Sequence, residues 1–248
     1  MNTGISTSAL AGRYSLLVFL LVSILFACKA EKPVKPKKPV PMVIIKPKRA
    51  VLTGEQRKEL GFPADVISQV ELAAGAEAEP FFVTEVVHSA NMKGEEGFER
   101  ARLAGFSVHT KQPDEIISSY RASLRAKGYL IFRSQRSYGK LNDIVTVVKG
   151  NATYDILKLQ RTEAPNYHLD TKDIVGWLKE RQKDASFVVT GAGPDWLETQ
   201  FIRPPENSAV FAKKIIDFAP DVLEHDQQTV EKVVERMNQM NGFFLVWD

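Results

Sequence analysis

Hydrophobic positions in residues 51–148 follow helical spacing in some stretches and strand composition in others. Thr53 and Gln56 have the spacing of a capping box, so we expect one helix over 54–61 and a second over 64–73. Runs rich in β-branched and aromatic residues predict strands. These runs cover 81–87, 106–108, 129–132 and 144–148.

The amphipathic pattern is clearest between residues 113 and 127. Pro113 stands at the first turn, Gly128 follows the end, and the apolar residues between them recur at helical spacing. We therefore expect a helix with one buried face, formed by Ile116, Ile117, Tyr120 and Leu124. The polar, glycine-containing stretch 89–104 is expected to be partly helical over 95–103.

The pattern after residue 150 predicts strand, helix, two strands, two helices and a final strand. Apolar residues alternate over 155–159, after the turn signal Gly150-Asn151, and this indicates a strand paired with 144–148. The other expected elements are a helix over 171–184 capped by Thr171, strands at 187–190 and 196–201, helices at 207–218 and 227–240, and a strand at 243–247. This order is that of a ferredoxin-like, split βαβ arrangement. The expected fold class is therefore α+β, with an antiparallel or mixed sheet and helices packed on one face.

A different pattern occupies residues 1–28. Arg13 precedes an uncharged run, Tyr14 to Ala27, that is shorter than the 20 or so apolar residues a membrane-spanning helix needs. This is the architecture of a signal peptide. The run closes on Leu25-Phe26-Ala27-Cys28, which resembles the lipobox of bacterial lipoprotein precursors, although Phe26 is bulkier than usual there. The resemblance implies that Cys28 is lipidated, while a secretory peptide cut elsewhere is the alternative.

Residues 29–50 are rich in lysine and proline. They contain eight basic residues and five prolines against a single acid, Glu31. Such a chain favours an extended form that rises about 3.1 Å per residue. We expect a tether between lipid and domain, either as a solvated spacer or as a segment whose lysines bind anionic lipid or a cell-wall polymer.

The tether changes the meaning of the whole-chain charge. The formal net charge is +3, but residues 51–248 contain 24 basic and 29 acidic residues once the tether and Arg13 are set apart. An acidic domain excludes nucleic acid as an expected partner, because phosphate binding needs clustered basic residues on the domain itself. Cys28 is the only cysteine, so neither disulfides nor thiol chemistry is expected in the domain.

Five separated motifs in the C-terminal part resemble the bacterial domain-of-unknown-function 4253 (DUF4253) family. They are Tyr154-Asp155-Ile156-Leu157, Gly191-Ala192-Gly193-Pro194-Asp195-Trp196, Pro220-Asp221-Val222, Thr229-Val230-Glu231 and Trp247-Asp248. This chain has Ala219 where the family usually has cysteine, and Val246 where it usually has tryptophan. The resemblance implies a domain over 140–248, preceded by an α+β region over 51–139, and it implies no activity.

Acidic residues at strand starts, turns and ends are the candidate catalytic groups. Asp195, Glu198, Asp221 and Asp248 could converge at one edge of the sheet and hold a divalent cation or share acid and base roles. The alternative is that they cap turns and helices. Because no histidine stands at metal-ligand spacing, we assign neither a metal nor any other cofactor.

Other candidate side chains have an ordinary alternative beside the functional one. Trp196 and Trp247 either line a binding pocket or belong to the core, and His225 is either near the acids or an exposed loop residue. The run Gly191-Ala192-Gly193 is interpreted as a hairpin, because a strand and not a helix is expected after it.

Two functions remain at this stage. The favoured one is a non-catalytic, membrane-anchored binding or interaction domain in the cell envelope, whose protein or small-molecule ligand is unknown. The alternative is a metal-assisted hydrolase that uses the acidic cluster. Lys29 follows Cys28, and in a cell with two membranes this favours the outer membrane over the inner one.

Overall fold

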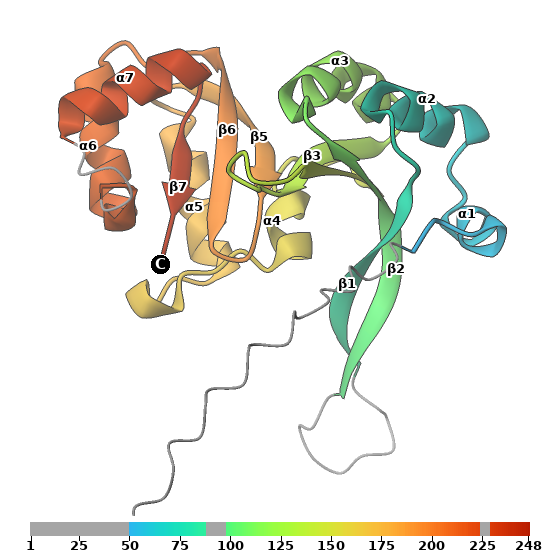
Figure 1. Ribbon diagram of the computed structural model, residues 1–248. Helices are drawn as coiled ribbons and strands as arrows, with labels where there is room; N and C mark the ends of the chain where they lie inside the picture. Colours follow the sequence, from blue (N-terminus) through green and yellow to red (C-terminus); the bar gives the residue numbers. More distant parts are fainter. Residues whose placement is uncertain (1–49, 88–97, 224–228) are drawn as a thin grey trace, which may run out of the picture. The chain divides into compact units, whose positions relative to one another are not determined.

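The computed structural model describes residues 50–87, 98–223 and 229–248, and Pro47–Asp248 form one compact unit (Figure 1). The strands are β1 (Glu79–Val87), β2 (Phe98–Thr110), β3 (Tyr129–Gln135), β4 (Asp143–Lys149), β5 (Ser186–Ala192), β6 (Trp196–Arg203) and β7 (Phe244–Val246). The helices are α1 (Gly54–Leu60), α2 (Ala64–Ala74), α3 (Pro113–Ala126), α4 (Asp155–Gln160), α5 (Thr171–Arg181), α6 (Ser208–Phe218) and α7 (Val230–Met240).

These strands form one mixed sheet in the order β1-β2-β4-β3-β5-β6-β7. Neighbouring strands are antiparallel except β3 and β5, which pair in parallel in the middle of the sheet. The expected α+β class with a mixed sheet is confirmed. The boundary expected at residue 140 falls in the loop between β3 and β4, so the sheet continues across it.

Several local predictions are confirmed by hydrogen bonds and burial. At α1, the Gln56 amide donates to Thr53 Oγ1 at 3.2 Å and the Thr53 amide donates to Gln56 Oε1 at 2.9 Å. Helix α3 buries Ile116, Ile117 and Leu124 on one face, as its apolar spacing predicts.

Residues 155–159 form helix α4, so the expected strand there is wrong. Ile156 and Leu157 are buried side by side, and Arg161 ends the helix in the left-handed region with a φ of 51°. A short apolar run fits either a buried strand or a buried helix turn, and its period alone does not separate them. Without this strand, the C-terminal part lacks the first element of the expected ferredoxin-like order.

Two further boundaries differ from the sequence prediction. Residues 98–103 are extended in β2, where the ladder to β1 supplies their backbone partners, so the helix expected over 95–103 is wrong in its described part. Asp170, and not Thr171, caps α5: its carboxylate accepts the Asp173 amide at 2.9 Å, and the Asp173 carboxylate accepts the Asp170 amide at 3.1 Å.

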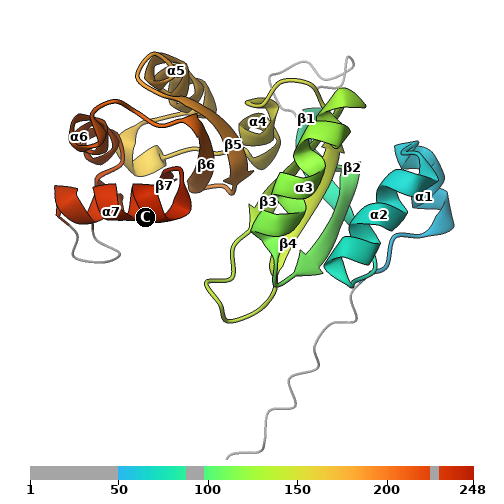
Figure 2. The ribbon, with the colours of Figure 1, turned by 90° about the horizontal axis from the view of Figure 1, so that it is seen from above.

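The helices cover both faces of the sheet, and the expectation of a single covered face is wrong (Figure 2). In β3, Ile131 packs into a core with α1, α2 and α3, whereas its neighbours Leu130 and Phe132 pack into a second core with α4 and α5. Consecutive buried residues are typical of a strand that is covered on both sides.

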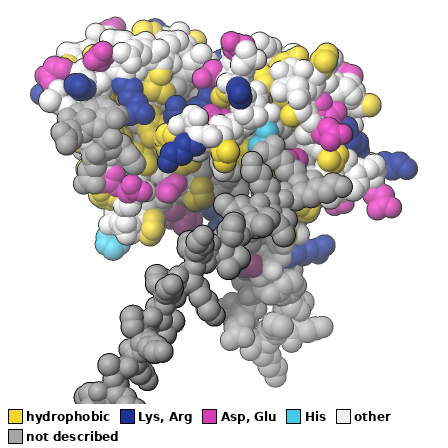
Figure 3. Space-filling view, in the orientation of Figure 1, with side chains coloured by type: hydrophobic (Ala, Val, Ile, Leu, Met, Phe, Trp, Pro, Cys, Tyr) yellow, Lys and Arg dark blue, Asp and Glu magenta, His cyan; other side chains and the backbone are white. Residues whose placement is uncertain are grey.

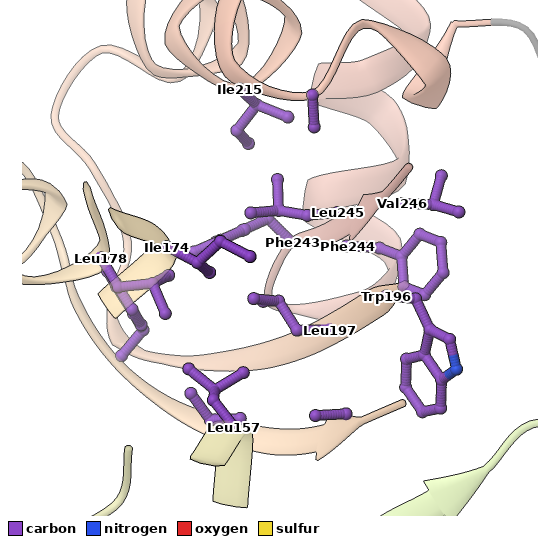
Figure 4. Close-up of a cluster of buried hydrophobic side chains, with 14 of the residues drawn as sticks. Leu157, Ile174, Leu178, Trp196, Leu197, Ile215, Phe243, Phe244, Leu245 and Val246 are labelled. Atoms are coloured by element: carbon purple, nitrogen blue, oxygen red, sulfur yellow. The ribbon is translucent and has the colours of Figure 1, made fainter. Parts of the chain in front are cut away.

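The second core fills the space between β5–β7 and helices α4–α7. Leu157 and Ile174, from α4 and α5, pack in this core with Leu197 of β6 and Leu245 of β7 (Figure 4). Phe243 lies at its centre, 4.9 Å from the ring of Phe187 and 5.4 Å from the ring of Phe211. None of the helices in the described residues combines the length and the apolar composition of a membrane-spanning segment.

Candidate functional site

Four residues on the neighbouring strands β3, β5, β6 and β7 are paired with one another and form a row across the sheet. Arg133 of β3 pairs with Gly191 of β5, Gly191 with Glu198 of β6, and Glu198 with Phe244 of β7. Residues paired in this way point to the same face, and adjacent strands are about 4.8 Å apart. Arg133 and Glu198 are therefore two strands apart, with a glycine between them.

Gly191 allows the two charged side chains to meet. Arg133 Nη1 donates to Glu198 Oε2 at 2.6 Å, and the Glu198 side chain occupies the space where a side chain at residue 191 would stand. A Cβ atom on Gly191 would lie 2.7 Å from Glu198 Oε1 and 2.8 Å from Glu198 Cγ, which is too close for either atom to remain in place. The ion pair thus depends on the absence of a side chain at this position.

Arg133 is buried and bound by three carboxylates from three elements. Besides Glu198, its Nη2 donates to Asp114 Oδ1 of α3 at 2.7 Å, and its Nε lies 3.2 Å from Asp143 Oδ2 of β4. Only 3% of the Arg133 side chain is exposed, against 85% of Asp114. The two terminal nitrogens of the guanidinium hydrogen-bond Glu198 and Asp114, whereas Nε is paired with Asp143 by charge only, without a hydrogen bond among the described residues.

The two carboxylate oxygens of Glu198 differ in their hydrogen bonds. Arg133 at 2.6 Å and Arg136 at 3.2 Å both donate to Oε2, whereas Oε1 is buried without a hydrogen-bond partner among the described residues. Burial raises the pKa of the Glu198 carboxyl, while the two arginines act to lower it. Because Oε1 has no donor among the described residues, the charged form of Glu198 is incompletely stabilised, which agrees with the raised pKa.

An open cleft of about 970 Å³, here called the outer cleft, lies beside this pair. Its walls are Thr110, Lys111, Pro113, Asp114, Arg133, Arg136, Tyr138–Asp143 and Arg236. Five of these side chains are basic and two are acidic, so the cleft is positively charged although the domain is acidic. Lys and Arg side chains gather on this face between α7 and α3 (Figure 3).

A second, smaller space of about 250 Å³ adjoins the outer cleft. It shares Asp114, Arg133 and Arg136 with the outer cleft, and its other lining residues are Ile117, Ser118, Thr190, Glu198, Thr199, Gln200, Gln239 and Met240. Arg136 therefore contacts a buried acid and also lines the open outer cleft.

Phe244 ends the row and has a guanidinium group from each of two elements against its ring. The Arg136 Cζ atom lies 5.1 Å from the ring centroid, and the Arg236 Cζ atom of α7 lies 5.4 Å from it. Both distances fall within cation–π range. Both guanidinium groups thus contact the same ring and line the same cleft.

Asp195, Asp221 and Asp248 are joined through backbone contacts near the C-terminal strand, and Glu198 lies elsewhere. The Asp221 carboxylate accepts from the Tyr167 hydroxyl and, at 2.7 Å, from the Asp248 amide, while the Asp195 carbonyl accepts from the Trp247 amide at 2.9 Å. These contacts tie the chain end to the start of β6. Glu198 instead contacts Arg133 and Arg136. Across residues 50–87, 98–223 and 229–248, no group of three His, Cys, Asp or Glu residues could hold a metal ion.

The remaining predicted residues have structural surroundings or lie outside the described part. Trp196 and Trp247 are core residues, 8% and 3% exposed, and Trp247 Nε1 donates to the Phe218 carbonyl at 3.3 Å. The predicted hairpin between β5 and β6 is confirmed, with Gly193 packed against the Trp196 ring. Cys28, the tether and His225 lie outside the described residues.

The basic side chains of the site are those that sequence reasoning missed. A signal was present: Arg133 directly follows the apolar run 129–132, and Glu198 stands inside the apolar strand 196–201. Charged residues are rarely buried unless they are paired, so two opposite charges inside buried strands indicate an ion pair.

The structure thus defines an α+β domain whose mixed sheet carries a buried Arg–Glu pair at the edge of a basic cleft. Residues 144–248 match the family model described as Domain of unknown function (DUF4253), which confirms the resemblance for the C-terminal part. Neither the comparison with curated proteins nor the comparison with solved structures gives a match.

Proposed function

We propose that this chain is a membrane-anchored lipoprotein of the cell envelope, and that residues 51–248 act as a non-catalytic binding domain whose ligand enters the outer cleft. The cleft carries the binding role: at about 970 Å³ it has the size of a ligand site, and its charge is opposite to that of the domain. Arg133 lines the cleft, and its position is fixed by ion pairs with three acids.

The binding role is tested by thermal unfolding of the full chain in detergent, because a ligand that binds only the native state raises its stability. The probes are sulfate, acetate and glucose. We expect the anions to raise the melting temperature, and we expect a Lys111→Glu/Lys140→Glu variant, reversed in charge at the exposed cleft rim, to lose this shift. Lys179→Glu, on the exposed side of α5, is the control and should keep it. Equal shifts in both variants, or none in the wild type, would contradict a binding role for the cleft.

The anchoring role rests on the lipobox-like string Leu25-Phe26-Ala27-Cys28 and on the tether that follows it. Two or more acyl chains hold a protein stably on a bilayer, whereas a single one does so only marginally. We expect Cys28→Ser to leave an uncleaved precursor or to release the protein from the membrane, and to abolish labelling by radioactive palmitate. Ser23→Ala, in the same apolar run, should be processed normally. Normal cleavage and membrane association of Cys28→Ser would refute the lipid anchor.

A further inference from the structure

Arg136 has two competing environments. Its Nη1 donates to Glu198 Oε2 at 3.2 Å, a longer contact than the 2.6 Å bond that Arg133 makes to the same oxygen. The rest of its guanidinium faces the outer cleft, 5.8 Å from the ring of Tyr138, and about a quarter of the side chain is exposed. Glu198 is thus an internal counter-ion that holds Arg136 from the buried side.

The second positive group at this wall comes from α7. Arg236 lines the same cleft and approaches the same Phe244 ring as Arg136. An oxyanion in the cleft accepts hydrogen bonds from guanidinium groups, and hydrogen bonds between charged groups are about twice as strong as those between neutral ones. Guanidinium forks fit the oxygens of phosphate, sulfate and carboxylate groups especially well.

We propose that the outer cleft binds an oxyanion group, phosphate-like or carboxylate, between Arg136 and Arg236, and that this anion replaces Glu198 as the partner of Arg136. The inference rests on the proposed binding role of the cleft and names the chemistry of its ligand. Glu198 keeps its 2.6 Å bond to Arg133 with and without the anion, so these two residues do not move on binding.

Displacement of Glu198 makes binding depend on pH. The charged groups around Glu198 are Arg133 of β3, Arg136 of the β3–β4 loop, Asp114 of α3 and Asp143 of β4. The arginines lower the pKa of Glu198, and burial and the two aspartates raise it. When Arg136 turns to the ligand, one lowering influence is lost and Glu198 takes up a proton more readily. By reciprocity, protonation of Glu198 strengthens anion binding, so affinity falls as the pH rises through the titration of this group.

The test is a sulfate titration of the full chain in detergent, followed by melting temperature at constant ionic strength between about pH 5 and 8, with chloride as the replacement salt. Sulfate is the main probe because it keeps its charge over this range, so a pH effect belongs to the protein. We expect the dissociation constant to increase with pH, by at most about tenfold per pH unit for one linked proton. A parallel titration with acetate separates tetrahedral from carboxylate preference.

Three variants test which residues are responsible for sulfate binding and for its pH dependence. We expect Glu198→Gln, neutral at every pH, to bind sulfate with a pH-independent constant that matches the tightest wild-type value. Arg236→Gln should weaken sulfate binding at least fivefold, and Lys179→Gln on α5 should not change it. Near-UV circular dichroism confirms the fold, and Arg236→Gln keeps the proposal testable if Glu198→Gln fails to fold.

Two results would overturn the inference. One is a Glu198→Gln variant that keeps the pH dependence of the wild type, and the other is an Arg236→Gln variant that binds sulfate as Lys179→Gln does. Either can occur while charge reversal at Lys111 and Lys140 still abolishes binding. The failure of this inference is therefore distinguishable from the failure of the binding role itself.

Discussion

Replacement of Arg133 by methionine is expected to lower the free energy of unfolding by about 3–5 kcal/mol, the range for a buried ion pair that loses one partner. Glu198, 3% exposed, would lose its 2.6 Å bond and remain buried beside Asp114 and Asp143 without its main cation. Methionine fills a similar volume, so the loss reports charge and hydrogen bonding more than a cavity.

The effect of Arg133→Met on the free energy of unfolding should depend on pH. Burial raises the pKa of Glu198 above its ordinary value of 4.5, so the folded state binds the proton more tightly than the unfolded chain does. Stability from this group is therefore fully present below 4.5 and decreases as the pH rises toward the raised native pKa. In Arg133→Met the penalty belongs to the ionised form, so the destabilisation should shrink in acid.

Urea denaturation by linear extrapolation, at neutral and acidic pH, measures these differences. The double variant Arg133→Met/Glu198→Leu removes the two most buried charges and should regain part of the lost stability, because apolar replacement of a buried pair is often neutral or better. Recovery is incomplete because Asp143 and Arg136 each lose a partner. Arg102→Met breaks an exposed pair with Glu85 and should cost about 1 kcal/mol or less. A double variant that loses the sum of the single effects would contradict the account.

A fragment limited to the family match, residues 144–248, is expected not to fold. It begins inside β4 and omits β3, which stands between β4 and β5 in the sheet. Without β3, one side of β5 has no strand to pair with, and Glu198 loses both of its arginines. Leu130 and Phe132 would also be missing from the second core, which leaves apolar surface exposed on α4 and β5.

The comparison fragment is 51–248, which removes only the expected signal peptide and tether. Both fragments contain Trp177, Trp196 and Trp247, so tryptophan fluorescence and near-UV circular dichroism report the same side chains in each. We expect 51–248 to melt cooperatively and 144–248 to show no cooperative transition. A cooperative melt with a native-like near-UV spectrum from 144–248 would show that β3 is dispensable.

Local signals made much of the fold predictable. Helix α3 and the β5–β6 hairpin follow from spacing, proline and glycine positions, all of which act within a few residues. The short run 155–159 was assigned to the wrong element because five residues do not resolve the two periods. The cap of α5 was misplaced by one residue, because Asp170 and Thr171 are both good caps.

The site was less predictable because its parts are distant in sequence. Arg133 and Glu198 are 65 residues apart, and they meet through a parallel pairing of β3 with β5 that no local pattern specifies. Arg236 reaches the same cleft from α7, and its place depends on where that helix packs. The acids that sequence reasoning selected were visible because they stand at turns, where three of them tie the chain end in place.

Gly191 has a consequence for how this site changes among related chains. Since a Cβ atom there would come within 2.7–2.9 Å of three Glu198 atoms, a relative with a side chain at this position has no room for the pair. Positions 133, 191 and 198 should therefore covary, with arginine and glutamate present only where the middle position is glycine. In an alignment of relatives, that triplet would mark the chains that have this cleft.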